Sequence, residues 1–161
     1  MKKLKLYIDT SVLGAFFDTE DQKRVDTAQS LIKLIKDKSC EGFISYLTLD
    51  EILKAPHDIK EKLKNIIAEG GFKILEEVEE CVELADAYVN DEIIPKKYRN
   101  DARHIAIGIY HECDFIVSWN YRHMVNITVR RLINSVNLKM GYKAVEIISP
   151  EEVIGNEEVE I

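Results

Sequence analysis

The chain has 161 residues, of which 46% are hydrophobic and 32% charged, and its formal net charge at pH 7 is −7. This length and apolar content predict one compact domain with a substantial buried core. The apolar run before Asp9 is too short for a signal-peptide core, and no stretch approaches a membrane span, so we expect a cytoplasmic protein without a membrane partner. Cys40, Cys81 and Cys113 are scattered and odd in number, which argues against a disulfide framework or a zinc knuckle and predicts reduced, mostly buried thiols.

The negative charge is concentrated at the C-terminal end. The stretch from Pro150 onward contains five Glu residues and no basic residue, which leaves a net charge of about −2 on residues 1–149. We expect one domain over 1–154 and an acidic tail over 155–161. Because the domain itself is nearly balanced, bulk charge does not exclude nucleic acid as a partner. The basic clusters at 96–103 and 130–131 could contact phosphates, although ordinary solvated surface is their commoner use.

The hydrophobic pattern alternates between strand and helix periods along the chain. Short apolar or β-prone runs predict strands, and apolar residues three or four positions apart predict helices. In chain order we expect a strand over 4–8, a helix over 24–38, a strand over 42–46, a helix over 58–69 that stops at two glycines, a strand over 72–75, helices over 78–91 and 100–112, and strands over 115–118 and 144–148. Strands separated by crossover helices predict an α/β fold with three α/β/α layers and a mostly parallel sheet of about five strands.

Four polar residues follow apolar runs or begin helices at what should be one edge of this sheet. They are Asp9 after the first strand, Glu51 after the second, Asp101 at the start of the helix over 100–112, and Asn120 after the fourth strand. Ligands of parallel sheets collect at the carboxyl ends of strands. Carboxylates gathered there repel one another unless a cation neutralises them, and oxygen donors suit Mg²⁺ or Mn²⁺. We therefore interpret all four as candidate catalytic residues for phosphodiester hydrolysis, and the three acids as metal ligands.

Each of the four also has a structural alternative that the sequence leaves open. Asp9 could be a helix N-cap. Glu51 could complete a capping box with Thr48, reaching back to the Thr48 amide. Asp101 could simply favour the positive end of a helix, and Asn120 could be a turn residue.

Four segments in succession resemble the motifs of PIN-domain nucleases. They are residues 6–12 (Leu-Tyr-Ile-Asp-Thr-Ser-Val), 45–51 (Ser-Tyr-Leu-Thr-Leu-Asp-Glu), 100–108 (Asn-Asp-Ala-Arg-His-Ile-Ala-Ile-Gly) and 115–123 (Phe-Ile-Val-Ser-Trp-Asn-Tyr-Arg-His).

Within that family the chain is most similar to the VapC-like branch. This resemblance implies a PIN-like fold and a Mg²⁺- or Mn²⁺-dependent endoribonuclease that cleaves RNA, often the toxin of a pair with an antitoxin protein as partner. By the matching motifs, the family's metal-binding acids fall on Asp9, Glu51 and Asp101. Thr10 and Ser11 assist near the first acid and are candidates for substrate binding.

The chain departs from the family pattern at Asn120, where a further Asp is common. A neutral amide binds a hard cation more weakly than a carboxylate, so Asn120 puts a second metal ion in doubt and could instead orient a water or a phosphate. Arg122 and His123 could contact RNA, although His123 could equally be a surface helix residue. Asp50 and Asp114 are close to the candidate segments in sequence, and we interpret both as structural.

Other classes of protein fit the sequence less well. A haloacid-dehalogenase-type phosphatase would need an acid where Ser11 stands. A di-iron protein built on Glu51, Asp101 and His104 would need a four-helix core, which the predicted strands oppose. The serious alternative is a catalytically weak or inactive PIN-like module that binds RNA or a protein. A homodimer is a further expectation, through apolar residues such as Leu13 that could equally belong to the core.

Overall fold

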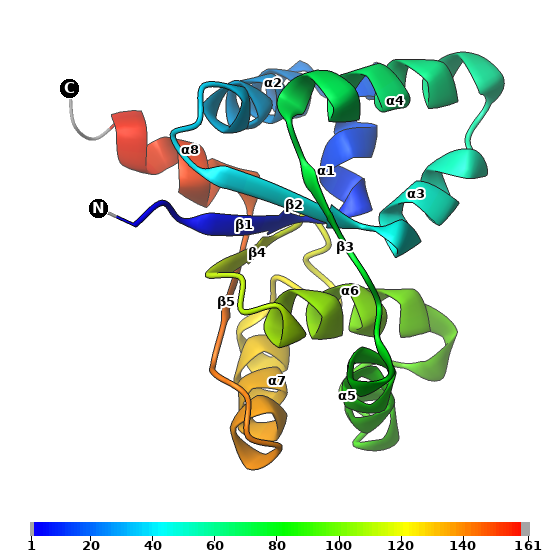
Figure 1. The fold of residues 1–161 in the computed structure, drawn as a ribbon, viewed down its shortest axis with the longest axis vertical. Coiled ribbons are helices and arrows are strands. Elements are labelled where there is room, and N and C mark those ends of the chain that lie inside the picture. The colour runs from blue at the N-terminus through cyan, green and yellow to red at the C-terminus, as the bar shows by residue number, and fades with distance from the viewer. Residues whose placement is uncertain (1, 159–161) are drawn as a thin grey trace.

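The computed structural model describes residues 2–158 and contains one five-stranded sheet with helices on both faces (Figure 1). The strands are β1 (Lys5–Ile8), β2 (Glu41–Ser45), β3 (Lys73–Leu75), β4 (Phe115–Val117) and β5 (Glu146–Ile148). Their order in the sheet is β3-β2-β1-β4-β5, and every pairing is parallel. The predicted three-layer α/β/α fold with a parallel sheet is confirmed.

The helices divide between the two faces of the sheet. One face carries α1 (Thr10–Gly14), the 3₁₀ turn η1 (Ala15–Phe17), α2 (Gln22–Lys36), α4 (His57–Gly70) and α8 (Pro150–Glu158). The other carries α5 (Glu79–Asn90), the 3₁₀ turn η2 (Lys96–Tyr98), α6 (Arg99–Tyr110) and α7 (Ile127–Lys139). Helix α3 (Tyr46–Leu53) follows directly on the end of β2. This division largely follows the chain: α1, α2 and α4, before β3, cover one face, the helices between β3 and β5 cover the other, and α8, after β5, returns to the first face.

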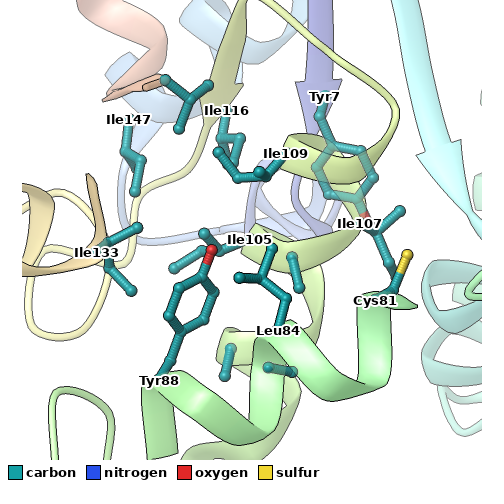
Figure 2. Packing of buried hydrophobic residues seen from close by; sticks show 14 of the residues in the cluster. Tyr7, Cys81, Leu84, Tyr88, Ile105, Ile107, Ile109, Ile116, Ile133 and Ile147 are labelled. Atoms are coloured by element: carbon teal, nitrogen blue, oxygen red, sulfur yellow. The ribbon is translucent and has the colours of Figure 1, made fainter. Parts of the chain in front are cut away.

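Successive strand residues point to opposite faces and so build two apolar clusters. In β1, for example, Tyr7 belongs to the cluster under α5, α6 and α7, whereas Leu6 and Ile8 belong to the cluster under α1, α2 and α4. Figure 2 shows the first cluster, where Tyr7 and Ile116 from the sheet approach α5 and α6. Gly108 permits the close approach of α6 to β4, because a Cβ at this position would lie 2.9 Å from Cγ1 of Ile116.

The predicted strands and helices are confirmed, with ends that differ by one or two residues. Helix α4 stops at Gly70, and Gly71 adopts a left-handed φ of 70°, as the pair of glycines predicted. The prediction missed α1, α3, α7 and α8 as defined helices. Helices α1 and α3 are short, and the buried face of α7 includes the polar Asn137, which weakens the apolar periodicity that reveals a helix.

Two further expectations concern the thiols and the tail. The thiols of Cys81 and Cys113 are buried, and burial raises their pKa to about 11 and about 12, which keeps them protonated and unreactive at neutral pH. The predicted acidic tail over 155–161 begins inside α8, and residues 159–161 lie outside the described residues. Among residues 2–158, no helix has the length and apolar character needed to cross a membrane.

Candidate active site

The candidate residues lie at the carboxyl ends of β1 and β4, where the order of the strands in the sheet reverses. The chain runs from β1 to β3 on one side of β1, then crosses over to form β4 and β5 on the other side. The ends of β1 and β4 therefore form a switch point, where open parallel sheets leave a crevice for ligands. Asp9 lies at this point, because its backbone N–H donates to the carbonyl oxygen of Val117 at 3.0 Å.

Asp9 is buried, with 6% of its surface exposed, and two hydroxyls hold its side chain. Ser11 Oγ and Ser118 Oγ both donate to Oδ2, at 2.8 and 2.6 Å. Asp9 occupies the N-cap position of α1, but its side chain accepts no capping hydrogen bond within the described residues. The capping alternative therefore does not explain the Asp9 carboxylate.

Glu51 lies in the interior of α3 and does not cap that helix. The helix begins at Tyr46, its N-cap is Ser45, and the reciprocal capping box is formed by Ser45 and Thr48. The capping box between Thr48 and Glu51 is thus wrong, because the helix starts earlier than that alternative required. The Glu51 side chain instead leaves α3 toward the sheet edge, where Oε1 accepts hydrogen bonds from Thr10 Oγ1 at 2.9 Å and from His104 Nε2.

Asp101 and Asn120 are hydrogen-bonded to each other across the edge. Asn120 Nδ2 donates to Asp101 Oδ2 at 2.9 Å, while Asn120 Oδ1 accepts from the backbone N–H of His123 at 3.0 Å. The backbone N–H can only donate, so it identifies the Asn120 oxygen and leaves the amide NH₂ facing Asp101. Asn120 is therefore both a turn residue and the partner of a candidate acid.

His123 is not a surface helix residue, so that alternative is wrong. It lies in the turn after β4, is 8% exposed, and stacks on Tyr98 with ring centroids 4.1 Å apart. Its Nδ1 lies 3.3 Å from Asp101 Oδ2. His123 thus lies against Asp101 as a second neighbour beside Asn120.

His104 joins the site, although the sequence suggested it only as part of the di-iron alternative. It is 1% exposed, its Nε2 contacts Glu51, and the same nitrogen lies 3.8 Å from Asp9 Oδ1. Its Nδ1 lies 2.6 Å from the hydroxyl of Tyr7. The available signal was the three-residue spacing between Asp101 and His104, which places both side chains on one face of α6.

Trp119 connects the edge to the C-terminal helix. Its backbone N–H donates to Ser11 Oγ at 3.1 Å, and its indole Nε1 donates to both carboxylate oxygens of Glu151 in α8, each at 2.8 Å. The guanidinium of Arg24 lies over the indole ring, 5.3 Å from the centroid. Nothing in the sequence pattern pointed to this contact between segments 32 residues apart.

The pKa shifts of the site follow from burial and from charges close together. Burial raises the pKa of Asp101, the charge of Asp9 raises it further, and the hydrogen bond from Asn120 opposes both. Burial would also raise the pKa of Glu51, but the hydrogen bond and charge of His104 outweigh it and lower the pKa. For His104 burial favours the neutral ring, yet the hydrogen bond to Glu51 and the surrounding carboxylates raise the pKa. The negative charge of Asp9 is therefore near enough to disfavour the charged form of Asp101.

Every hydrogen bond to the three acids falls on one oxygen of each carboxylate. Supporting groups engage Oδ2 of Asp9, Oε1 of Glu51 and Oδ2 of Asp101. Among residues 2–158, the second oxygen of each acid accepts no hydrogen bond. In the same range no group of three or more His, Cys, Asp or Glu side chains is arranged as a ready-made metal site. The edge thus holds three carboxylates that are each fixed by hydrogen bonds but are not arranged around a common point as metal ligands would be.

Much of the predicted basic surface near the site is neutralised within the fold. Arg99 and Arg103 form ion pairs with Asp86 and Glu77, each at 2.6 Å. The remaining cations of that cluster, at 96–97, are exposed. The structural interpretation of Asp114 holds, because its Oδ2 accepts from the backbone N–H of Lys5 at 2.7 Å.

Comparison with known proteins identifies the family of the chain. Residues 6–124 match the family model of the PIN domain. The chain belongs to the PIN domain family. All four candidate residues lie inside the matched range, and α7, β5 and α8 lie beyond it. None of the curated proteins matches the chain significantly.

Solved structures of similar fold include VapBC complexes and a VapC toxin. The VapBC2 complex of Rickettsia felis bound to a promoter DNA fragment is 13% identical, with a TM-score of 0.60 over 91% of this chain and 98% of that chain. DNA-bound VapBC of Salmonella typhimurium gives the same identity, TM-score and coverage. VapC20 of Mycobacterium tuberculosis, a toxin that cleaves the sarcin–ricin loop, is 14% identical, with a TM-score of 0.52 over 73% of this chain and 92% of that chain. At these identities the similarity concerns the fold, and this PIN domain has the fold of VapC proteins.

Proposed function

We propose that this PIN domain is a metal-dependent endoribonuclease that hydrolyses RNA phosphodiesters at the edge formed by β1 and β4. The observation that carries the proposal is the arrangement of three carboxylates, each of which accepts its hydrogen bonds from residues 2–158 through only one of its two oxygens. Burial and the nearby charge of Asp9 raise the pKa of Asp101, which supports a cation as the missing partner.

The donor set fits Mg²⁺ or Mn²⁺, which both prefer oxygen ligands. Asp9, Glu51 and Asp101 would hold the ion, which when bound would polarise the phosphoryl oxygen and lower the pKa of an attacking water. Because the three acids do not form a ready-made site, their side chains must adjust when the ion binds. Ser118 and Asn120 would limit that adjustment, since each donates to an acid from the end of β4.

The chain's own residues divide into those that support the acids and those that face solvent. The hydroxyls of Thr10 and Ser11 donate to Glu51 and Asp9, so they would orient the acids first and contact substrate only secondarily. Arg122 is exposed two residues after Asn120 and would contact an RNA phosphate. His123 is covered by Tyr98 and would act on the substrate only through Asp101.

The same proposal includes a biological setting. VapBC complexes among the proteins of similar fold support a role as the toxin of a toxin–antitoxin pair, with an antitoxin protein as partner and the cytoplasm as location. A homodimer remains a prediction. Leu13, one of the apolar residues considered for such contacts, is buried in the core.

The test is RNA cleavage by the purified protein with Mn²⁺, with Mg²⁺ and with a chelator. Asp9→Asn keeps an oxygen that can accept from Ser11 and Ser118 but removes the charge. We expect it to lower the cleavage rate on the order of 100-fold, equivalent to about 3 kcal/mol of transition-state stabilisation. Asp50→Asn is the matched control, because Asp50 is an exposed acid next to Glu51 on α3, and it should leave the rate unchanged.

Two results would contradict the proposal. Equal cleavage with and without chelator would remove the metal from the reaction. RNA binding without cleavage under every condition would favour the alternative, a PIN-like binding module that has lost catalysis.

A further inference from the structure

A buried line of polar side chains runs from β2 through β1 to the candidate acid of α3. The hydroxyl of Tyr7 lies 2.8 Å from Ser45 Oγ and 2.6 Å from His104 Nδ1. His104 then contacts Glu51 through Nε2. Ser45 and Tyr7 are completely buried and His104 nearly so. Four elements, β2, β1, α6 and α3, are therefore joined by this line beneath the sheet edge.

The hydrogen bonding of the line fixes the His104 ring at both nitrogens. Glu51 Oε1 is an acceptor, so Nε2 must carry a hydrogen in either protonation state of the ring. On the other side the Tyr7 hydroxyl can donate to or accept from Nδ1, and Ser45 completes its pairing in both cases. The ring cannot turn without breaking one of these contacts, so the position of Glu51 Oε1 is set from inside the core.

Packing alone does not account for these groups. Tyr7 and its neighbours lie in an apolar cluster, where burying a hydroxyl and an imidazole requires that each find a partner. Phe and Leu would fill a similar volume without that requirement. The polar line ends on Glu51, whose Oε2 accepts no hydrogen bond within residues 2–158. Hydrogen bonds to one oxygen of a carboxylate are how proteins orient a metal ligand.

We propose that Tyr7 and His104 are positioning residues that orient the Glu51 carboxylate for the divalent cation. This inference rests on the proposed function of the edge. Neither residue touches substrate in this role, and both act through Glu51. The expected consequence of loosening Glu51 is weaker metal binding and a lower kcat with an unchanged KM for RNA, because no substrate contact is altered.

The fold offers a matched pair of variants for the test. Tyr7→Phe removes the hydroxyl that holds His104. Tyr88→Phe removes a hydroxyl from an equally buried tyrosine of the same cluster, whose partner is Asn137 and which does not contact the acids. We expect Tyr7→Phe to weaken Mn²⁺ binding about ten-fold in calorimetry, the usual effect of losing an outer support of a metal ligand, and Tyr88→Phe to leave it unchanged.

A second pair tests His104 directly and provides a rescue. His104→Leu removes the donor to Glu51, whereas His104→Gln places an amide NH₂ at a similar reach. We expect His104→Leu to weaken Mn²⁺ binding on the order of 100-fold and His104→Gln to restore most of it. Thermal melts of all four variants identify any that fail to fold. If both His104 variants fail to fold, the comparison of Tyr7→Phe with Tyr88→Phe decides the test.

The outcomes separate this inference from the proposed function. If the wild type does not bind Mn²⁺, both are wrong. If the wild type binds Mn²⁺ but Tyr7→Phe binds it as tightly, or if Tyr88→Phe weakens binding equally, the positioning role is overturned and the metal site stands. Equal affinities of the Gln and Leu variants at position 104 would overturn it as well.

Discussion

Two polar networks cross the same apolar cluster, and each contains a completely buried tyrosine. The network of Tyr88 runs through Asn137 and Asn134 to the backbone of Val145, so it joins α5 and α7 to the segment before β5. The network of Tyr7 runs through His104 to Glu51 at the edge of the sheet.

The two networks differ in how they end. The Tyr88 network contains only neutral groups and closes on a backbone amide and carbonyl, which satisfies its members and stabilises the packing of three elements. The Tyr7 network ends at the charged carboxylate of Glu51, which accepts both of its hydrogen bonds through Oε1. The Tyr88 network therefore stabilises packing, whereas the Tyr7 network is the one that we propose to position a metal ligand.

The largest expected effect comes from removing the charge of Glu51, at the end of the Tyr7 network, and it concerns the rate of RNA cleavage. Glu51→Gln should reduce RNA cleavage on the order of 100-fold, because the amide cannot replace a charged ligand. The free energy of unfolding should change by less than about 1 kcal/mol, since the Gln oxygen still accepts from Thr10 and His104, and the helix cap belongs to Ser45 and Thr48. Cleavage assays and urea denaturation measure the two quantities. An active variant would return Glu51 to a structural role and remove the contrast between the networks.

An intermediate effect is expected at Asn120, which donates to Asp101. Asn120→Asp replaces this donor with an anion. It should lower the thermal stability of the metal-free protein and raise Mn²⁺ affinity about ten-fold, because the added carboxylate is a hard ligand. Calorimetry and melting curves with and without Mn²⁺ provide the measurement. Reduced RNA binding without a gain in Mn²⁺ affinity would mean that the amide serves a phosphate, and no change in either would leave Asn120 as a turn residue.

The smallest effect on Mn²⁺ affinity is expected from removing a hydrogen-bonding side chain of the Tyr88 network. Asn134→Ala leaves the N–H and carbonyl of Val145 without their side-chain partner, which should lower the free energy of unfolding by about 1–3 kcal/mol. Mn²⁺ affinity should stay within about two-fold of the wild type, as measured by calorimetry on the folded variant. A parallel loss of stability and metal affinity would show that the networks are coupled and that their separation is mistaken.

The sequence predicted what depends on local pattern. Asp9 could be placed because it follows an apolar run, and Asp101 because it begins an amphipathic segment. The parallel order of strands and helices then predicted one sheet edge for both. The stop of α4 at Gly70 was predictable for the same reason, since glycine after an apolar period favours a left-handed C-cap.

What could not be predicted depends on contacts between distant segments. Ser118 holds Asp9 across 109 residues of chain, and His104 reaches Glu51 across 53. The hydrophobic periodicity of a segment does not predict such contacts between distant residues. The start of α3 was misjudged because Ser45 and Thr48 both suit an N-cap, and only the end of β2 decides between them. The two alternatives for His123 could not be separated because it stacks on Tyr98, which lies on a different segment.

Trp119 is the only tryptophan in the sequence, and it lies one position before Asn120. Its indole is held by Glu151 and covered by Arg24, while its backbone is hydrogen-bonded to the serine that supports Asp9. The protein therefore carries a built-in fluorophore whose electrostatic surroundings include both the sheet edge and α8. If metal or RNA binds at the acids as proposed, the binding would change the electric field at this indole, so its emission would give a label-free optical signal from the site.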